Sequence, residues 1–324
     1  NEERLFLCKC RDVRRELIPS PLNYTGGKFK LLPQLLPLFP RTMEQMVDLF
    51  CGGCNVGINA PTSKVLFNDT NPWLTGLFEV LKEQEEKEVF RQIDSLISRF
   101  GLSRSWENGY GAYHCENSGD GLAAFNREPF LKLREAFNSK KEKDEEYYLM
   151  LYVLIVYSFN NQIRFNRKGE FNLPVGKRDF NLRMQQKLRG FMERLKCGDY
   201  RFSNQDFRRI RPDEFPQGTF FYADPPYLIT CATYNEQRGW TGKDEEELLA
   251  YLDQVDVLGH FFALSNVVEG PAGKNEILLG WVKKNQGRYR MIPLDFGYSN
   301  SSYHKKDKKG QEREVLIVNY GQPH

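Results

Sequence analysis

The stretch that decides the fold is Gly218-Thr219-Phe220-Phe221-Tyr222-Ala223-Asp224-Pro225-Pro226-Tyr227. Its apolar first part, residues 218–223, predicts a buried strand. The two prolines that follow remove two backbone donors and fix φ, so the turn is stiff and its carbonyl groups face outward. Asp224 and an exposed carbonyl therefore offer two fixed hydrogen-bond acceptors, and the Tyr227 ring offers a flat apolar face beside them.

This combination suits a planar exocyclic amine, which would donate hydrogen bonds to the acceptors while its ring stacks on the tyrosine. It predicts a pocket for the amino group of a nucleobase. The alternative is an ordinary Pro-Pro turn at the end of a strand, in which Asp224 bonds a local amide. These four residues alone do not decide between the two interpretations.

A second strand followed by glycines lies upstream. Residues 46–50 predict a buried strand, and Cys51-Gly52-Gly53-Cys54-Asn55-Val56-Gly57 follows it. Glycines directly after a strand allow a nucleotide-like ligand to approach the backbone closely. The spacing is not GxGxxG, which argues against a dinucleotide fingerprint. Strand, glycine loop, helix and a further strand (residues 64–67) together indicate half of a nucleoside-binding sheet.

Asp69 follows the strand at 64–67 and is placed to accept two ribose hydroxyls. Alternatively, Asn68 and Asp69 cap a helix that begins near Pro72. Earlier in the chain, Thr25-Gly26-Gly27 predicts a turn that opens a short helix, whose N-terminus and Lys28 suit an anionic group. A plain turn with a solvated lysine explains that segment equally well.

Strands and helices alternate over the rest of the chain, which argues for a mainly parallel sheet. Further strands are expected at 200–202, 260–264, 288–293 and 314–320. Helices are expected at 73–100 (one or two), 129–137, 147–159, 181–195, 244–258 and 276–284. The helix at 147–159 is apolar on all sides and should be buried. Residues 101–121 are rich in Gly, Ser, Asn and aromatic residues and form a long connection.

Positive charge is concentrated in one window. Residues 161–210 contain 13 Lys and Arg against five acidic residues, a net charge of +8, whereas the whole chain carries +3. Basic residues interleaved with Asn, Gln and aromatic residues suit phosphate contacts and reading of base edges. Some of these charges belong instead to the outer face of the helix at 181–195. The window predicts a nucleic-acid partner.

Other classes of protein are disfavoured. The longest apolar run, residues 147–157, is too short to cross a bilayer, and no signal peptide is visible. The four histidines and seven cysteines lack metal-ligand spacing. A redox dithiol at Cys51 and Cys54 is an alternative to reduced cysteines, which we expect throughout. These patterns predict a cytoplasmic protein without a metal and without a membrane segment.

Five segments in this order resemble the Dam-like, α-group DNA adenine-N6 methyltransferases. They are Tyr24-Thr25-Gly26-Gly27-Lys28, Asp48-Leu49-Phe50-Cys51-Gly52-Gly53, Asp69, Asp206-Phe207 and Asp224-Pro225-Pro226-Tyr227. The resemblance covers nearly the whole chain from about residue 19, and several motifs in order are far more specific than any one. Residues 164–176 resemble the family's target-recognition segment.

The resemblance implies an enzyme that transfers a methyl group from S-adenosylmethionine to N6 of adenine in duplex DNA, as in restriction–modification systems. Its catalytic residues would be Asp224, Pro225, Pro226 and Tyr227, with Tyr227 stacked on a flipped base. Its cofactor-binding residues would be Tyr24, Lys28, Asp48, Phe50, Gly52, Gly53, Asn55, Asp69, Asp206 and Phe207. Its DNA-binding residues would be Asn23, Arg164, Asn166, Arg167, Lys168, Asn172, Tyr303 and Lys305.

The implied fold is a Rossmann-like α/β methyltransferase sheet with a reversed last strand and an inserted, mainly helical target-recognition domain. Residues 19–85 and 198–324 would form the catalytic domain, 86–197 the target-recognition domain, and 1–18 a lead-in segment. We expect a monomer that binds double-stranded DNA, is encoded by a bacterium or phage, and associates with the nucleoid.

One residue departs from the family pattern. Asn23 stands where some GATC-specific relatives carry a lysine that reads guanine. Lysine only donates hydrogen bonds, whereas asparagine also accepts them, and its bidentate partner is typically adenine. The recognition sequence therefore need not be GATC.

Three alternatives belong to other classes. An enzyme acting on RNA adenine fits the catalytic residues, whereas one acting on a protein amide more often has Asn in place of Asp224. A catalytically silent DNA-binding module would keep the fold and fail to bind S-adenosylmethionine. A NAD-linked dehydrogenase is disfavoured because the glycine spacing is wrong and no catalytic His or Tyr-Lys pair is apparent.

Overall fold

The computed structural model describes residues 16–24, 26–115, 119, 121–231, 239–294 and 312–321. The chain divides into two compact units. The sheet unit comprises Lys30–Cys51, Ala60–Thr70 and Asp199–His324, and the helical unit comprises Asn1–Phe29, Gly52–Asn59 and Asn71–Gly198. The division into a catalytic domain at 19–85 and 198–324 and a target-recognition domain at 86–197 is a functional one and stays a prediction.

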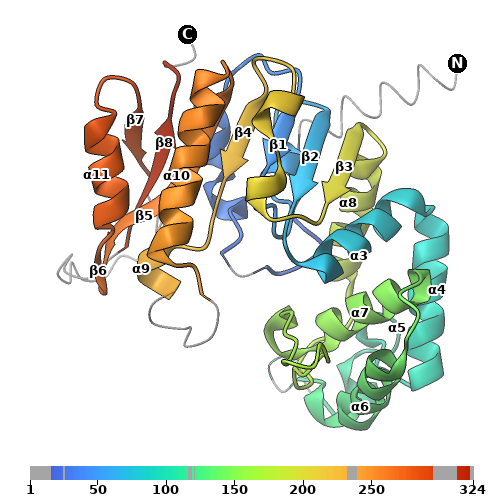
Figure 1. Ribbon diagram of the computed structural model, residues 1–324. Coiled ribbons are helices and arrows are strands. Elements are labelled where there is room, and N and C mark those ends of the chain that lie inside the picture. The colour runs from blue at the N-terminus through green and yellow to red at the C-terminus, as the bar shows by residue number, and fades with distance from the viewer. Residues whose placement is uncertain are drawn as a thin grey trace, which may run out of the picture. The chain divides into compact units, whose positions relative to one another are not determined.

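The sheet unit contains one sheet with the strand order β3-β2-β1-β4-β5-β8-β7 (Figure 1), and the short strand β6 pairs with β5. The strands β3, β2, β1, β4 and β5 are parallel, and β8 runs antiparallel to both β5 and β7. The mainly parallel sheet with a reversed last strand is therefore confirmed. The strands are β1 (Met46–Asp48), β2 (Lys64–Asn68), β3 (Asp199–Ser203), β4 (Phe220–Ala223), β5 (Phe261–Gly270), β6 (Gly273–Lys274), β7 (Arg290–Pro293) and β8 (Arg313–Val318).

Strand β5 is longer than predicted, because two polar residues continue it. Ser265 and Asn266 pair with β8 and are fully buried. The Ser265 hydroxyl lies 2.8 Å from the Tyr222 hydroxyl, and the Asn266 amide donates to Glu245 at 2.9 Å. Buried polar groups are tolerated in a core strand when they are hydrogen-bonded. Ser265 and Asn266 therefore continue the strand, although polar residues suggested that it ended before them.

Helices cover one face of this sheet. α10 (Gly242–Val257) and α11 (Glu276–Lys284) pack on β5 (Figure 1), and apolar residues of β1, β4, β5 and β8 form the core beneath them. α10 begins two residues earlier than predicted because Thr241 and Asp244 form a capping box ahead of it. On the sheet, Phe39 contacts Phe220 and Tyr222; Phe39 follows the short helix α2 (Leu32–Leu35).

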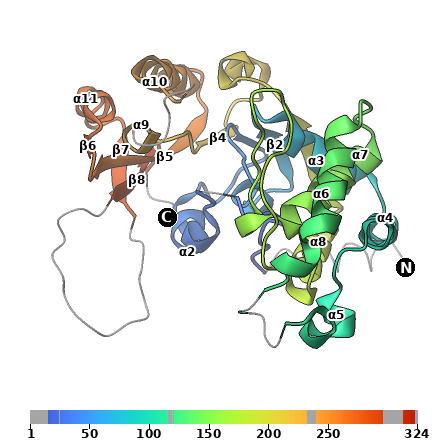
Figure 2. The same ribbon diagram turned by 90° about the horizontal axis from the view of Figure 1, so that it is seen from below.

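The helical unit is built around α7 (Glu145–Tyr157), which contacts α3 (Pro72–Glu83), α4 (Glu86–Phe100) and α6 (Ala123–Ser139) (Figure 2). Ten of its 13 residues are buried, as its apolar composition predicted. α5 (Ser105–Asn108) and α8 (Leu182–Leu195) complete the α-helices of this unit's described residues. The helix predicted at 129–137 begins earlier, at Ala123, with Pro129 in its interior. Because a proline is typical of the first turn of a helix, the prediction placed the start of this helix at Pro129, which is too late.

Two further expectations need correction. The helix expected between the glycine loop and β2 is only a three-residue 3-10 turn (Gly57–Asn59), because few residues remain before β2 and Pro61 is among them. Cys51, Cys54 and Cys115 carry thiols and are not in disulfides, but Cys197 is disulfide-bonded, so the expectation of reduced cysteines throughout is wrong. Tyr303, Lys305 and most of the lead-in segment lie outside the described residues.

Within the described residues, none of the helices is both long and apolar enough to cross a membrane. The same part of the chain contains no group of three or more His, Cys, Asp or Glu side chains arranged to hold a metal ion.

Candidate active site

Four carboxylates of the sheet unit lie at the carboxyl ends of its parallel strands. Asp48 ends β1, Asp69 follows β2, Asp206 follows β3 and Asp224 follows β4. Parallel strands present their carboxyl ends along one edge of the sheet, which is where open α/β sheets bind ligands. The sequence-predicted acidic residues of this unit therefore share one edge.

The Asp224–Tyr227 turn is held by hydrogen bonds of its own. It follows the fully buried strand β4, and the half-buried Tyr227 hydroxyl donates to Asp224 Oδ1 at 2.9 Å. The same hydroxyl lies 3.0 Å from Oε1 of Glu314, a buried residue of the reversed strand β8. Pro225 is buried and Pro226 is exposed. One partner of Asp224 is thus a phenol from its own motif.

Two tyrosines beside this turn remain neutral over the ordinary pH range. Burial, and then the negative charge of Asp224, raise the pKa of Tyr227 well above its usual value. The same two causes raise the pKa of Tyr222, the residue of β4 paired with Asp48. Neither phenol therefore acts as a base, and the Tyr227 hydroxyl donates to the neighbouring carboxylates.

An aromatic cluster lies near the same edge of the sheet. The Phe50 ring centroid is 5.6 Å from that of Phe207 and 5.7 Å from that of Trp240, and Phe207 and Trp240 are 6.0 Å apart. Phe50 and Trp240 are half-buried, whereas Phe207 is buried. The Trp240 indole donates to Glu245 at 2.6 Å, which fixes its plane. Sequence reasoning missed Trp240, although its position just before the Thr241 helix cap was a usable signal.

Asp206 has a basic neighbour at this edge. Its carboxylate accepts hydrogen bonds from the Arg208 backbone at 2.9 Å and from the Arg208 guanidinium at 3.0 Å. The same guanidinium also bonds Asp244 and Glu247 of α10. Asp206 is thus oriented by a network that links the end of β3 to α10.

The helix-capping alternative for Asn68 and Asp69 is wrong. Asn71 caps α3, and its side chain accepts from the backbone of Trp73 and Leu74. The Asn68 amide instead donates to the carbonyls of Leu49 and Gln205 and so ties the strand ends together. The Asp69 carboxylate is half-buried.

In the helical unit, the space left by the missing side chains of Gly52 and Gly53 is occupied by other residues of the protein. A Cβ on Gly52, whose φ is +47°, would lie 2.8 Å from the Tyr24 ring. A Cβ on Gly53 would lie 2.9 Å from the Ser20 hydroxyl. Asn55 accepts from the Ser20 backbone at 2.8 Å. These contacts hold the segment that carries Tyr24 against the glycine loop. The Tyr24 ring itself remains exposed at the surface.

The helix expected after Thr25-Gly26-Gly27 is too short to provide the anion-binding N-terminus that the sequence suggested. The residues from Phe29 form a 3-10 turn followed by α2, which has four residues. Lys28 is buried, and its ammonium donates to the Gly26 carbonyl at 3.1 Å. The described geometry therefore favours a lysine held within the turn over the solvated lysine of the alternative interpretation.

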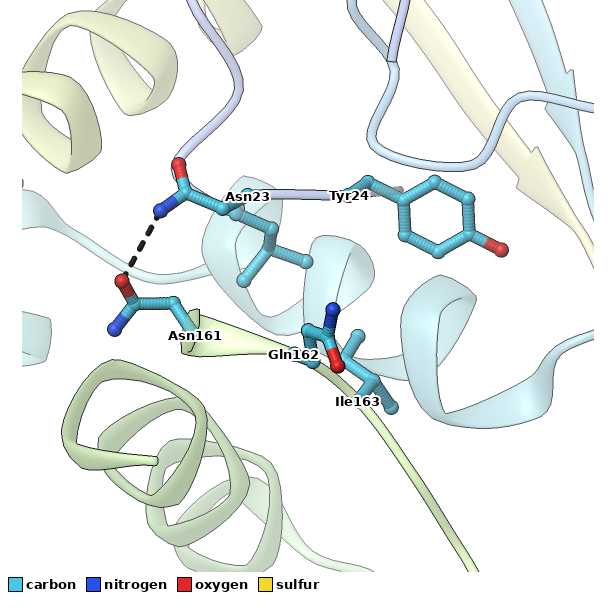
Figure 3. A pocket seen from close by; sticks show the side chains of 6 residues that line it. Asn23, Tyr24, Asn161, Gln162 and Ile163 are labelled. Atoms are coloured by element: carbon cyan, nitrogen blue, oxygen red, sulfur yellow. Dashed lines mark hydrogen bonds between the residues drawn. The ribbon is translucent and has the colours of Figure 1, made fainter. Parts of the chain in front are cut away.

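Asn23 lies in a small surface pocket of the helical unit with Leu22, Tyr24, Asn161, Gln162 and Ile163. Figure 3 shows the Asn23 and Asn161 amides pointing toward each other, with the Asn23 nitrogen 3.1 Å from the Asn161 oxygen. The Asn23 oxygen accepts from the Lys187 ammonium of α8 at 3.1 Å. One lone pair of the Asn23 oxygen is thus engaged by Lys187, and the role of Asn23 in base reading stays a prediction.

Residues 164–172 form a hairpin closed by a bridge between Phe165 and Phe171. Within it, Arg164 bonds Asn172 at 2.8 Å, and the Asn166 side chain accepts from the backbone of Lys168 and Glu170. Three of the five predicted DNA-binding residues here, Arg164, Asn166 and Asn172, thus stabilise the turn. Arg167 and Lys168 lie exposed at its tip.

The hairpin is anchored on the helices behind it. The Phe165 ring stacks on Trp73 of α3 with centroids 3.8 Å apart and an interplanar angle of 11°. The Asn138 side chain of α6 bonds both the backbone N–H and the carbonyl of Phe171, as a neighbouring strand would. Stacking and paired hydrogen bonds at the base of the hairpin hold its charged tip in a defined place.

The chain was compared with known proteins. The model for D12 class N6 adenine-specific DNA methyltransferases matches residues 24–292. The chain belongs to this family. The Asp-Pro-Pro-Tyr turn and the glycine loop described above fall within the matched residues, of which Tyr24 is the first.

Several curated D12-like relatives are modification enzymes. The chain is 38% identical over 309 residues to the type II methyltransferase M.FokI of Planomicrobium okeanokoites, and 36% identical over 312 residues to the modification methylase StsI of Streptococcus sanguinis. Each match covers 94% of this chain and 43% of the relative, so the chain spans less than half the length of these two proteins. The DNA adenine methylase of Escherichia coli K12 is 24% identical over 72% of this chain and 74% of its own length.

Proposed function

We propose that this chain is a site-specific DNA methyltransferase that modifies N6 of adenine in duplex DNA. The observation that carries the proposal is the Asp224 carboxylate, held at the carboxyl end of β4 by the Tyr227 hydroxyl, in a chain that belongs to the D12 methyltransferases. Its relatives M.FokI and StsI are named as modification methyltransferases. Nucleoid association and a monomeric state stay predictions.

The chemistry of this site is positioning and electrostatic stabilisation. The adenine amine is a poor nucleophile because its lone pair is delocalised into the ring. Acceptors at Asp224 and the Pro225 carbonyl would bind its two hydrogens and favour a pyramidal nitrogen that attacks a methyl carbon in line. As the N–C bond forms, the bond from the methyl carbon to sulfur would break and S-adenosylhomocysteine would leave, while the amine would lose a proton to the Asp224 carboxylate. The target base leaves the duplex to reach this turn and stacks on Tyr227.

S-adenosylmethionine fits the groups found at the sheet edge. Its sulfonium supplies an electrophilic methyl group when bound. The aromatic cluster of Phe50, Phe207 and Trp240 suits an adenine ring, and the Asp69 carboxylate at the end of β2 suits two ribose hydroxyls. Tyr24, Lys28, Asp48, Gly52, Gly53, Asn55 and Asp206 remain proposed members of this cofactor site.

We propose that the helical unit contains the target-recognition domain and that the hairpin tip contacts DNA phosphates. The double substitution Arg167→Ala/Lys168→Ala should reduce the slope of log K against log salt concentration by about two, since each phosphate contact contributes about 0.9. Methyl transfer at saturating DNA should change little. Lys132→Ala, which removes an exposed charge from α6, is the matched control. An unchanged slope in the double variant would remove the hairpin tip from the DNA interface.

We also propose that Asn23 and Lys187 act together on a base edge. Burial, and then the neighbouring Arg183, lower the pKa of Lys187, and its ammonium holds the Asn23 oxygen. A donor-rich pair favours guanine, whose major-groove edge has two acceptors. Lys187→Met should release the Asn23 oxygen and relax selectivity at one base pair by about 1–3 kcal/mol. Methylation rates on substrates varied at each position measure this, and identical preferences in both proteins would contradict it.

The proposed function is tested with purified protein. Duplex DNA is incubated with S-adenosylmethionine that carries a labelled methyl group, and the DNA is then digested to nucleosides. We expect label in N6-methyldeoxyadenosine. Label in RNA adenine only, with an RNA duplex offered in parallel, would favour the RNA alternative. Cofactor binding without transfer to either substrate would favour a catalytically silent module.

A further inference from the structure

Glu314 is a buried carboxyl group that the proposed mechanism does not yet use. It lies on β8, the reversed strand, with 3% of its surface exposed. Its Oε1 atom is 3.0 Å from the Tyr227 hydroxyl, which also contacts Asp224 Oδ1 at 2.9 Å. A single phenol oxygen therefore connects Glu314, 87 residues further along the chain, to the catalytic carboxylate.

A phenol has one hydrogen, so it donates fully to only one of two carboxylates at a time. A hydrogen donated wholly to Asp224 would occupy a lone pair of the group that must bind the adenine amine. A second acceptor shares that hydrogen and holds the phenol oxygen between the two carboxylates, so the phenol positions Asp224 while bonding it less strongly. Bonds to charged acceptors are about twice as strong as neutral ones, so a buried carboxylate is suited to this task.

We propose that Glu314 is a positioning residue for methyl transfer, which acts through the Tyr227 hydroxyl to orient Asp224 and leave its lone pairs available to the target amine. The inference rests on the proposed function. It assigns a role to a residue on the reversed strand, at the point where β8 pairs with β5 through Val267. In the proposed function Asp224 and Tyr227 contact the target base, whereas no base contact is assigned to Glu314.

The prediction concerns the rate of a single turnover, because that rate isolates the chemical step from product release. Glu314→Gln keeps the shape of the side chain and removes its charge. It should lower the single-turnover rate about tenfold or more, the effect of a lost charged hydrogen bond. The dissociation constants for S-adenosylmethionine and duplex DNA should stay within about twofold, since Glu314 touches neither.

Tyr227→Phe supplies the decisive comparison. It keeps the stacking ring and removes the connecting hydroxyl. If Glu314 acts through that hydroxyl, Tyr227→Phe and Tyr227→Phe/Glu314→Gln should have equal single-turnover rates. If the two losses multiply instead, Glu314 supports the strand and not Asp224, and the inference is wrong.

Two controls keep the outcomes apart. Arg313→Gln changes the exposed neighbour on the same strand and should leave the rate unaltered, which measures any general disturbance of β8. Absence of methyl transfer by the wild-type chain would instead contradict the proposed function and not this inference. If Glu314→Gln lowers the melting temperature and weakens the binding of S-adenosylmethionine and of DNA together with the rate, the role of Glu314 is structural and the proposal is overturned.

Discussion

Replacing Asp224 by alanine is expected to reduce the single-turnover rate of methyl transfer about 10²- to 10³-fold. The substitution removes the charged acceptor that would bind one amine hydrogen and take the proton as the N–C bond forms. Loss of one preorganised group that stabilises developing charge typically costs about 2.7–4 kcal/mol in the transition state. Rapid quench with enzyme in excess over DNA measures the rate directly.

The same variant should still bind both ligands. Asp224 is only half-buried, and the Tyr227 hydroxyl keeps Glu314 as a partner, so the fold has little reason to change. Cofactor and DNA dissociation constants within about threefold of the wild-type values are expected. Asp213→Ala, which removes an exposed carboxylate paired with Arg211, is the matched control and should be fully active. Substantial methylation by the Asp224 variant would refute the assigned role.

Gly52→Ala is expected to lower affinity for S-adenosylmethionine about tenfold or more. The new Cβ would lie 2.8 Å from the Tyr24 ring, closer than a stable contact allows. The ring is exposed, so it can swing aside, and the surface it offers would then be lost. The positive φ of +47° adds a backbone cost of about 1–2 kcal/mol in stability. Titration calorimetry measures the affinity, and thermal melting measures the stability.

Gly101→Ala separates these two effects. Gly101 has φ +77° at the end of α4, and no atom lies within 4 Å of the position of its Cβ. Gly101→Ala should lower stability as Gly52→Ala does, because both place alanine in a left-handed backbone conformation. It should leave the affinity for S-adenosylmethionine unchanged. Equal affinities in the two variants would show that the Tyr24 ring, as placed by Gly52, does not contribute to the cofactor site.

The sheet was predictable because its signals are local. Short apolar runs such as 220–223 end in polar or acidic residues, and glycine and proline separate them. The strand β5 was underestimated because Ser265 and Asn266 look like a strand end when read alone. Their partners, Tyr222 and Glu245, come from other elements, so no local pattern announces that the polar residues are satisfied within the core.

The candidate site was predictable where one motif carries several functional residues. Asp224 and Tyr227 are three positions apart, and their mutual hydrogen bond is local. Glu314 and Lys187 were missed because they meet their partners 87 and 164 residues away in sequence. In the sequence, Glu314 begins an ordinary strand, and Lys187 looks like one of several solvated charges on a helix. Only packing in three dimensions distinguishes such residues from surface charge.

The glycine loop shows a different difficulty. The sequence indicated that Gly52 and Gly53 make room, and the structure agrees, but the space is occupied by Tyr24 and Ser20. A missing Cβ allows close approach without specifying what approaches. The Asn23 amide is similar, since its residue type suggested a base partner but not that the Lys187 ammonium donates to its oxygen.

The central claim, that this chain methylates adenine N6 at a defined DNA sequence, is tested most directly by single-molecule sequencing of plasmid DNA. The plasmid is isolated from a host that lacks adenine methylation and expresses this chain. We predict modified adenines confined to one short motif, and none when the host expresses Asp224→Ala. Unmodified DNA from cells containing folded protein that binds S-adenosylmethionine would contradict the claim.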